Sequence, residues 1–145
     1  MRNLKKVLAL VLTLALALSV AAGAAFTDQK QIKNTEAVDA CVALNIIGGY
    51  PDGSYKPEGN ITRAEFCKMI CIALNGGKEP TLGTTTKATF TDVRTSANSA
   101  WAEKYIESCV SQGIVSGIGG GKFAPDDFCT RGQIVTFLYR AYQGK

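Results

Sequence analysis

Apolar residues recur at helical spacing in four stretches of the chain, and the stretches form two pairs. The first stretch of the first pair contains Val38, Cys41 and Val42. The first stretch of the second pair contains Trp101, Tyr105 and Cys109. The second stretches carry longer apolar faces: Phe66, Met69, Ile70, Ala73 and Leu74 in one, and Ile134, Phe137, Leu138 and Ala141 in the other. Spacings of three and four positions are typical of amphipathic helices. The pattern predicts an all-α fold of two helix–turn–helix units forming a small helical bundle.

Glycine-rich segments separate the two helices of each pair. The segment 49–55 reads Gly-Tyr-Pro-Asp-Gly-Ser-Tyr, and its counterpart at 117–123 is richer still in glycine. Such residues tolerate positive φ or pre-set a turn. We expect Gly48-Gly49 to end the first helix and Gly113 to interrupt the third.

The two pairs are divergent copies of one repeat. Phe26-Thr27-Asp28 recurs further along the chain as Phe90-Thr91-Asp92. At a slightly larger offset, 68 in the numbering, four further elements recur: Cys41-Val42, Gly53, Pro57 and Thr62-Arg63 match Cys109-Val110, Gly121, Pro125 and Thr130-Arg131. We therefore divide the chain into repeat 1 (25–75), a Gly/Thr/Lys-rich linker (76–89) and repeat 2 (90–145).

A capping box is expected at the start of the second helix in each repeat. Thr62 is followed three positions later by Glu65, and Thr130 by Gln133. In this motif the threonine and the Glu or Gln side chains satisfy backbone N–H groups reciprocally. The apolar pairs Ile61 with Phe66, and Cys129 with Ile134, are placed to form the accompanying hydrophobic staple.

An arginine occupies the first helical position after each cap, and the helix dipole disfavours a cation there. Arg63 and Arg131 therefore need another explanation. A guanidinium beside free backbone N–H groups suits a carboxylate or phosphate ligand. The alternative is a structural ion pair with an acidic residue such as Asp28 or Asp92.

The first residues have the order of a secretory signal peptide: a cationic start, an apolar middle and the small residues Ala22-Gly23-Ala24. The alternative, a retained membrane anchor, is disfavoured because an apolar core of about a dozen residues is short of the roughly 20 that a spanning helix needs. We expect residues 1–24 to be removed, after Ala24 or Ala25, and the mature chain to be exported without a membrane span.

Charge and composition narrow the function further. Loss of Arg2, Lys5 and Lys6 leaves 13 basic against 12 acidic residues, so basicity gives no argument for nucleic-acid binding. The absence of His excludes His-based triads and His-ligated zinc. Asp52, Asp126 and Asp127 lack the spacing of a calcium loop, so we expect no metal and no cofactor.

Five cysteines leave at least one thiol unpaired or paired between chains. Cys67 and Cys71 lie four positions apart and share a helix face. A single pair at this spacing is a weak metal signal, and we favour a role as small buried hydrophobes.

The combined motifs resemble the S-layer homology (SLH) repeat. Repeat 1 carries Phe26-Thr27-Asp28, Gly49 to Pro57 and Ile61-Thr62-Arg63-Ala64-Glu65-Phe66. Repeat 2 carries Phe90-Thr91-Asp92-Val93, Trp101-Ala102, Gly113-Ile114-Val115, Phe123-Ala124-Pro125 and Thr130-Arg131-Gly132-Gln133. The usual binding unit of the family has three repeats with ligand grooves between them, whereas two are found here.

The resemblance implies a non-catalytic module that holds an exported protein on the bacterial cell wall. It implies binding to an anionic, pyruvate-bearing secondary wall polysaccharide, a peptidoglycan-linked polymer, with Arg63 and Arg131 at its charged end. By weaker analogy, Trp101 is a platform for a sugar ring, and Tyr50 with Asp52 lines the groove. The alternatives are that Trp101 belongs to the helix core and that Asp52-Gly53 serves the turn. The residue types favour these alternatives over ligand binding.

Three functional hypotheses follow. The first is a secreted cell-surface module that binds the wall polymer. The second is an assembly element that docks to itself or to another repeat-bearing surface protein, because a repeat with an open edge needs a neighbour. The third, an enzyme, would require a convergent catalytic group, and no His or recognisably spaced carboxylate pair supplies one.

Overall fold

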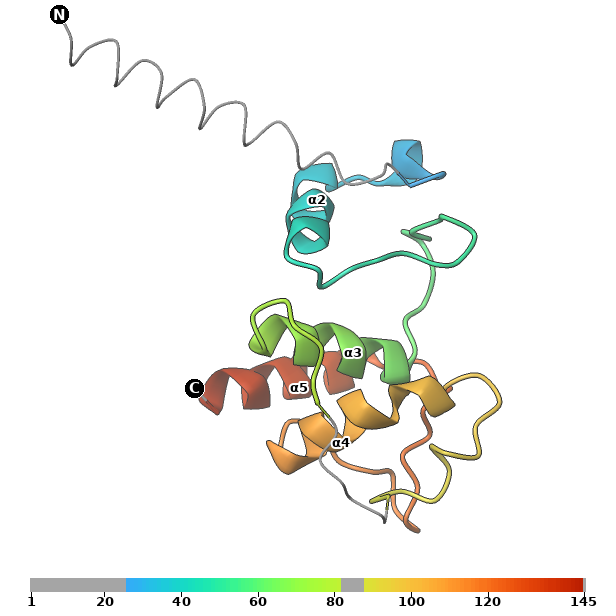
Figure 1. Ribbon diagram of the computed structural model, residues 1–145, viewed down its shortest axis with the longest axis vertical. Coiled ribbons are helices and arrows are strands. Elements are labelled where there is room, and N and C mark those ends of the chain that lie inside the picture. The colour runs from blue at the N-terminus through green and yellow to red at the C-terminus, as the bar shows by residue number, and fades with distance from the viewer. Residues whose placement is uncertain (1–25, 82–87, 145) are drawn as a thin grey trace, which may run out of the picture.

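A computed structural model of the protein describes residues 26–81 and 88–144, so the predicted signal segment 1–24 lies outside the described residues. The elements in chain order are η1 (Gln29–Gln31), α2 (Thr35–Ala43), α3 (Arg63–Leu74), η2 (Ala100–Ala102), α4 (Glu103–Ser111) and α5 (Arg131–Gln143) (Figure 1). Within these ranges the only β-type pairings are two isolated bridges, Thr62 with Phe128 and Gly119 with Lys122. The prediction of an all-α fold is confirmed. No helix in the described ranges is both long and apolar enough to traverse a bilayer.

The helices reproduce the repeat. Both bounds of α4 fall at the repeat offset from those of α2, and α5 begins at the same offset from the start of α3. Both predicted capping boxes form: Thr62 with Glu65, and Thr130 with Gln133. The local signals at these helix starts therefore act as the sequence indicates.

The first helix of repeat 1 ends earlier than predicted, whereas that of repeat 2 ends just before Gly113, as expected. Helix α2 stops at Ala43, and Asn45 adopts a left-handed conformation with φ of 59°. Ile46 N–H donates to Cys41 O and Asn45 N–H to Val42 O, which is the Schellman arrangement. Gly113, at the equivalent position in repeat 2, has φ of 68°. The expected stop at Gly48-Gly49 is wrong because Asn45 already supplies the left-handed residue.

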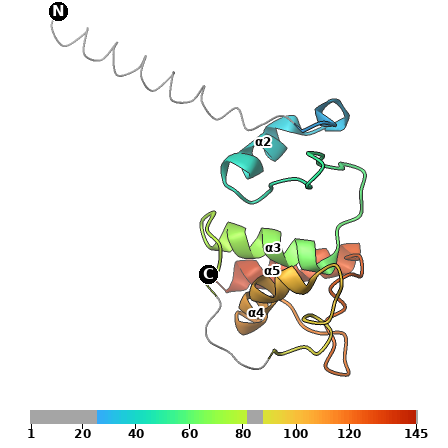
Figure 2. The same ribbon diagram turned by 45° about the vertical axis from the view of Figure 1, so that its right-hand side comes forward.

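Helix α3 is the centre of the bundle. It packs against α4 and α5, whereas α2 stands apart on the other side of α3 in both views (Figures 1 and 2). Its residues Cys67 and Cys71 are 0% and 2% exposed, and Cys109 of α4 is 0% exposed. The Phe66 and Phe137 rings join α3 to α5 with centroids 5.8 Å apart. The expectation of cysteines as buried hydrophobes is confirmed for Cys67 and Cys71.

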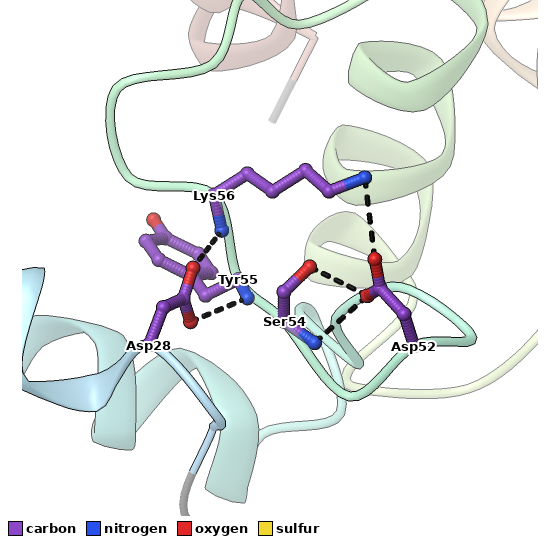
Figure 3. Close-up of polar contacts among 5 residues, drawn as sticks. All are labelled: Asp28, Asp52, Ser54, Tyr55 and Lys56. Carbon is purple, nitrogen blue, oxygen red and sulfur yellow. Dashed lines mark hydrogen bonds and ion pairs between the residues drawn. The ribbon is translucent and has the colours of Figure 1, made fainter.

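In each repeat the Phe-Thr-Asp motif contacts the glycine-rich segment between the two helices, which we call the turn (47–57 in repeat 1 and 115–125 in repeat 2). Asp28 accepts hydrogen bonds from Tyr55 N–H at 2.9 Å and Lys56 N–H at 2.8 Å (Figure 3). The Phe26 and Tyr55 rings lie 5.4 Å apart. The carboxylate thereby holds Lys56 at φ of 58°, a conformation that costs a non-glycine residue about 1–2 kcal/mol.

Repeat 2 copies this arrangement. Asp92 accepts from Phe123 N–H at 2.9 Å and Ala124 N–H at 2.8 Å, and Ala124 has φ of 56°. Phe90 lies 5.3 Å from Phe123. Burial raises the pKa of Asp92, but the two N–H donors outweigh it and leave that pKa below its usual value.

Two residues within the predicted linker contact α4. Glu79 pairs with Lys104 at 2.8 Å and accepts a hydrogen bond from the Tyr105 hydroxyl. Thr89 N–H donates to Glu107 at 2.7 Å. Both contacts tie the segment between the repeats to the bundle.

Helix α5 buries less of its apolar face than predicted. Phe137 and Ala141 are buried, but Leu138 is 51% exposed. The reason is that, among the helices of the described ranges, α5 packs mainly against α3, which leaves Leu138 on an exposed side of α5.

Candidate functional site

A groove of about 500 Å³ lies where the repeat 1 turn meets α3 and the start of repeat 2. Tyr50 and Trp101, both predicted site residues, line it. Charged residues from two elements join them: Lys56 from the turn, and Glu65 and Lys68 from α3. The groove therefore brings together aromatic and cationic groups from both repeats, which lie far apart in the sequence.

Trp101 presents an exposed indole to this groove. Its side chain is 47% exposed, and its ring nitrogen donates to Asn98 O at 2.8 Å. Tyr105 packs edge-on at 6.0 Å with an interplanar angle of 70°. The interpretation of Trp101 as helix core is wrong, because Trp101 lies in η2 before α4 begins and Ala102 occupies the buried position instead.

Lys68 supplies a positive charge beside the indole. Its ammonium lies 5.7 Å from the Trp101 ring centroid and 5.9 Å from that of Tyr105. Across the described ranges Lys68 takes part in none of the ion pairs, which join Lys33 to Glu58, Lys56 to Asp52, Arg94 to Glu103 and Lys104 to Glu79. This ammonium is therefore available to an anionic ligand.

Lys56 and Asp52 sit together at the turn. The Lys56 ammonium lies 4.2 Å from the Tyr50 ring centroid. It also lies 3.6 Å from an Asp52 oxygen (Figure 3). Asp52 also accepts from Ser54 N–H at 3.0 Å and from the Ser54 hydroxyl at 2.6 Å. The Ser54 hydrogen bonds lower the pKa of Asp52. These contacts are turn chemistry, and Asp52 stands beside the groove without lining it.

Tyr50 and Glu65 form a second polar pair in the groove. Burial, together with a hydrogen bond to Glu65 and its charge, raises the pKa of the Tyr50 phenol to about 12. Glu65 is held in turn by Thr62 N–H at 2.8 Å as part of the capping box. The phenol therefore stays protonated and its carboxylate partner is fixed, so both can serve as oriented hydrogen-bonding groups.

Arg63 is buried between the repeats. It is 2% exposed, and its guanidinium donates to Phe123 O at 2.9 Å and Ser116 O at 3.0 Å. It also lies over the Phe123 ring at 4.4 Å. The alternative of an ion pair with Asp28 or Asp92 is wrong, because the Arg63 guanidinium donates to these carbonyls and takes part in none of the ion pairs of the described ranges. Arg63 thus connects α3 to the repeat 2 turn.

Arg131, the equivalent residue of repeat 2, is exposed. Neither arginine lines the groove. Their assignment to the charged end of a ligand therefore stays a prediction, and the groove draws its positive charge from Lys56 and Lys68.

No group of three potential metal-ligating side chains gathers within the described ranges. The thiols add no alternative site. Cys109 donates to Cys67 O at 3.6 Å, and its hydrogen bonding to Cys67 raises its pKa. Hydrogen bonding to Cys109 and burial raise the pKa of Cys71. These thiols behave as neutral core groups.

Sequence reasoning missed Lys56 and Lys68. A signal for Lys68 exists, because it is the one charged residue between Glu65 and the end of α3 at Leu74. A lysine within an apolar stretch of a helix keeps its ammonium at the edge of the buried surface. Lys56 carries no such signal, since its position over Tyr50 depends on the turn conformation.

Comparison with known proteins gives the family. The family model of the S-layer homology domain matches residues 25–67 and 89–135. A cellulosome-anchoring protein of Acetivibrio thermocellus is 40% identical over 92 residues, which is 63% of this chain and 20% of that protein. A cell surface protein of Thermoanaerobacter kivui is 32% identical over 147 residues, 97% of this chain and 19% of that protein.

An endo-1,4-beta-xylanase A of Thermoanaerobacterium saccharolyticum is also similar, 32% identical over 109 residues, 75% of this chain and 9% of the relative. The chain spans about one fifth or less of the length of these relatives. The family model covers more than half of the chain, in two separate segments. The chain therefore belongs to the S-layer homology domain family.

Proposed function

We propose that the chain is a non-catalytic, exported cell-surface module that binds an anionic secondary cell-wall polysaccharide of the pyruvylated type in the groove at Trp101. The observation that carries this proposal is an exposed indole fixed beside the Lys68 ammonium, which has no ion-pair partner in the described ranges.

The chemistry of the groove suits a sugar that bears a carboxylate. An aromatic face packs against the apolar C–H face of a pyranose ring, while charged and polar groups fix its orientation. Lys68 and Lys56 would attract the carboxylate, and Tyr50 with Glu65 would hydrogen-bond hydroxyl groups. A lysine ammonium is a compact point charge and does not need the two-point geometry of an arginine. A single lysine can therefore pair with each acidic group of the ligand.

The proposal predicts one such groove per chain. Positions equivalent to Tyr50, Lys56 and Lys68 in repeat 2 are Ile118, Ala124 and Thr136. The position equivalent to Trp101 in repeat 1 is Lys33. The repeats share their scaffold but not these side chains, so we expect the second turn not to take the same ligand.

The relatives support a binding role rather than catalysis. The segment similar to this chain occurs in proteins named as an anchoring protein, a cell surface protein and a xylanase, and it makes up at most 20% of each. A segment shared by proteins of such different names is better explained by attachment than by a common reaction. We propose the cell surface as the location on the same grounds.

The test is co-sedimentation of the exported chain with purified cell-wall sacculi, before and after mild acid removes the secondary polymer. We expect Lys68→Gln and Trp101→Ala each to weaken pelleting about tenfold, the loss of one charge-assisted or aromatic contact. Lys30→Gln and Phe128→Ala are matched controls, because both residues are exposed and lie outside the groove. Equal pelleting on stripped and intact sacculi would contradict the proposal.

A further inference from the structure

Repeat 1 contains a second hollow, of about 320 Å³, between α2 and its own turn. We call it the socket. Its lining includes Val38 and Cys41 from α2, and Ile47, Tyr55 and Pro57 from the turn. In the described ranges no other helix packs extensively against α2, which stands apart from the other helices (Figures 1 and 2). No described helix therefore covers this hollow.

The same hollow is filled in repeat 2. The equivalent positions there are Ile106, Cys109, Val115, Phe123 and Pro125, and all of them are buried. The N-terminal end of α3 covers them. Arg63 N–H donates to Asp127 O at 2.8 Å, Ala64 N–H donates to Pro125 O at 3.0 Å, and the Arg63 side chain donates to Phe123 O. The contact between α3 and repeat 2 therefore shows how the start of a helix would fill the socket of repeat 1.

Helix α5 is the repeat 2 equivalent of α3, and the helix face that α3 buries is exposed in α5. Cys67 and Cys71 of α3 contact Cys109 of α4, and their equivalents in α5 are Val135 and Tyr139. Val135 is 60% exposed and Tyr139 is 62% exposed, whereas the two cysteines are buried.

This exposed face extends along the whole of α5. Leu138 and Tyr142 are 51% and 75% exposed. With Val135 and Tyr139 they follow the spacing of three and four positions that places side chains on a single helix face, and exposed Arg131 begins that face one turn earlier. We call these five residues the plug. Four large apolar side chains on one face form a patch that solvent exposure disfavours.

The backbone groups match as well. Carbonyls of Tyr55, Pro57 and Gly59 in repeat 1 correspond to those of Phe123, Pro125 and Asp127 in repeat 2. The repeat 2 carbonyls accept hydrogen bonds from α3, while those of repeat 1 have no such partner within the described ranges. The acceptors needed for a second contact of this type are thus present and free there.

We propose that the plug of one copy of this chain docks into the socket of a second copy. In this contact Arg131 takes the place of Arg63, and its guanidinium donates to the Tyr55 and Gly48 carbonyls of the second copy. The occupant is a second copy because this chain supplies both surfaces, and because its own α3–repeat 2 contact is the template for the pairing. The proposal does not depend on polymer binding.

Such a contact is head-to-tail, since each copy offers a different surface to its neighbour. It therefore makes a specific prediction for mixtures of variants. A copy with a defective plug still has a sound socket, and a copy with a defective socket still has a sound plug. Neither associates with itself, but the two together form one contact.

The experiment measures the mass of the exported chain by light scattering over a range of concentrations. Tyr139→Asp disables the plug, and Ala37→Arg, at an exposed residue that lines the socket, disables the socket. We expect the unmodified chain to self-associate, each variant to be monomeric, and an equimolar mixture to form a 1:1 complex. Circular dichroism checks the fold, and Tyr142→Asp with Cys41→Arg replaces any variant that fails it.

A second pair of variants tests the arginine. Arg131→Ala should weaken self-association about tenfold or more, because it removes two hydrogen bonds from a charged donor. Arg140→Ala, on another side of α5, is the matched control and should change it less than about twofold. A chain that stays monomeric up to about 1 mM would overturn the proposal. So would association that Tyr139→Asp abolishes but Ala37→Arg leaves intact, because that result indicates a plug-to-plug contact.

Discussion

Arg63 and Arg131 occupy the same position of the repeat but have opposite surroundings. Both begin a helix directly after a capping threonine. Arg63 is 2% exposed and donates to two carbonyls of repeat 2, whereas Arg131 is exposed. Replacing each arginine by alanine therefore measures how much the inter-repeat contact of Arg63 contributes to the free energy of unfolding, with position 131 as the reference.

Arg63→Ala should lower the free energy of unfolding by about 3–5 kcal/mol. Each hydrogen bond from a charged donor contributes about 1.5–3 kcal/mol, and the Phe123 O and Ser116 O acceptors would lose their partner. The packing of the guanidinium over the Phe123 ring at 4.4 Å is lost as well. Against a total stability of roughly 5–15 kcal/mol for a domain of ordinary size, this is a large fraction.

Arg131→Ala should change the stability of the monomer by less than about 0.5 kcal/mol, the usual effect of a surface substitution. Arg63→Lys should fall between the two, at about 1–2 kcal/mol, because an ammonium keeps the charge but cannot reach both carbonyls as the planar fork does. The assay is urea unfolding followed by circular dichroism, at a concentration low enough to keep the chain monomeric. Equal losses at positions 63 and 131, or a loss below about 1 kcal/mol for Arg63→Ala, would refute the assigned role.

Four further measurements test other parts of the structure. Asp92→Asn should cost about 1–2 kcal/mol by weakening the hydrogen bonds to Phe123 and Ala124. Because the folded pKa of Asp92 lies below the ordinary value of 3.8, the stability it contributes is present above that pH and is lost as the pH falls through the folded pKa; acid unfolding should therefore be shallower in the variant, and unchanged acid sensitivity would count against this contact. Gly49→Ala should destabilise by more than about 2 kcal/mol in thermal unfolding, since its φ is +72° and a Cβ would come within 2.5 Å of the Phe26 ring, whereas Gly76→Ala, with φ of +63° and open space, should cost about 1 kcal/mol. Glu65→Gln should lower the pKa of Tyr50 from about 12, measured by ultraviolet titration of the phenols, because the charge of its hydrogen-bond partner is removed; an unchanged value would mean that burial alone sets it. Thiol labelling of the native chain should reach Cys41 and Cys129 before the buried Cys67, Cys71 and Cys109, and rapid reaction of all five would contradict the core.

Local signals in the sequence predicted local structure well. The capping boxes at Thr62 and Thr130 form because each depends on residues three positions apart. The offset of 68 that Cys41-Val42 and the later motifs share predicted the relation between the helices, because the same residues give the same local fold. By contrast, α2 ends before the position that Gly48-Gly49 indicates, because Asn45 takes the left-handed conformation that Gly113 has in the other copy.

The candidate site was only partly predictable. Arg63 stands out in the sequence as a cation at the start of a helix, but its partners are backbone carbonyls of repeat 2, and carbonyl acceptors leave no signal in the sequence. Trp101 fits a helical apolar pattern, yet η2 turns the indole outward while Ala102 is buried. Lys56 and Lys68 enter the groove only once the turn of repeat 1 lies over α3.

The most direct test of groove binding uses the protein's single tryptophan as reporter. Fluorescence of Trp101 would be followed while purified secondary polymer is added to the exported chain, and again with polymer from which the pyruvate groups have been removed. The proposed function predicts a saturable change in emission with the intact polymer and a change at least about tenfold weaker in affinity without pyruvate, because Lys68 then loses its anionic partner. Binding of the polymer with no change in Trp101 emission, or no binding at all by the folded chain, would contradict it.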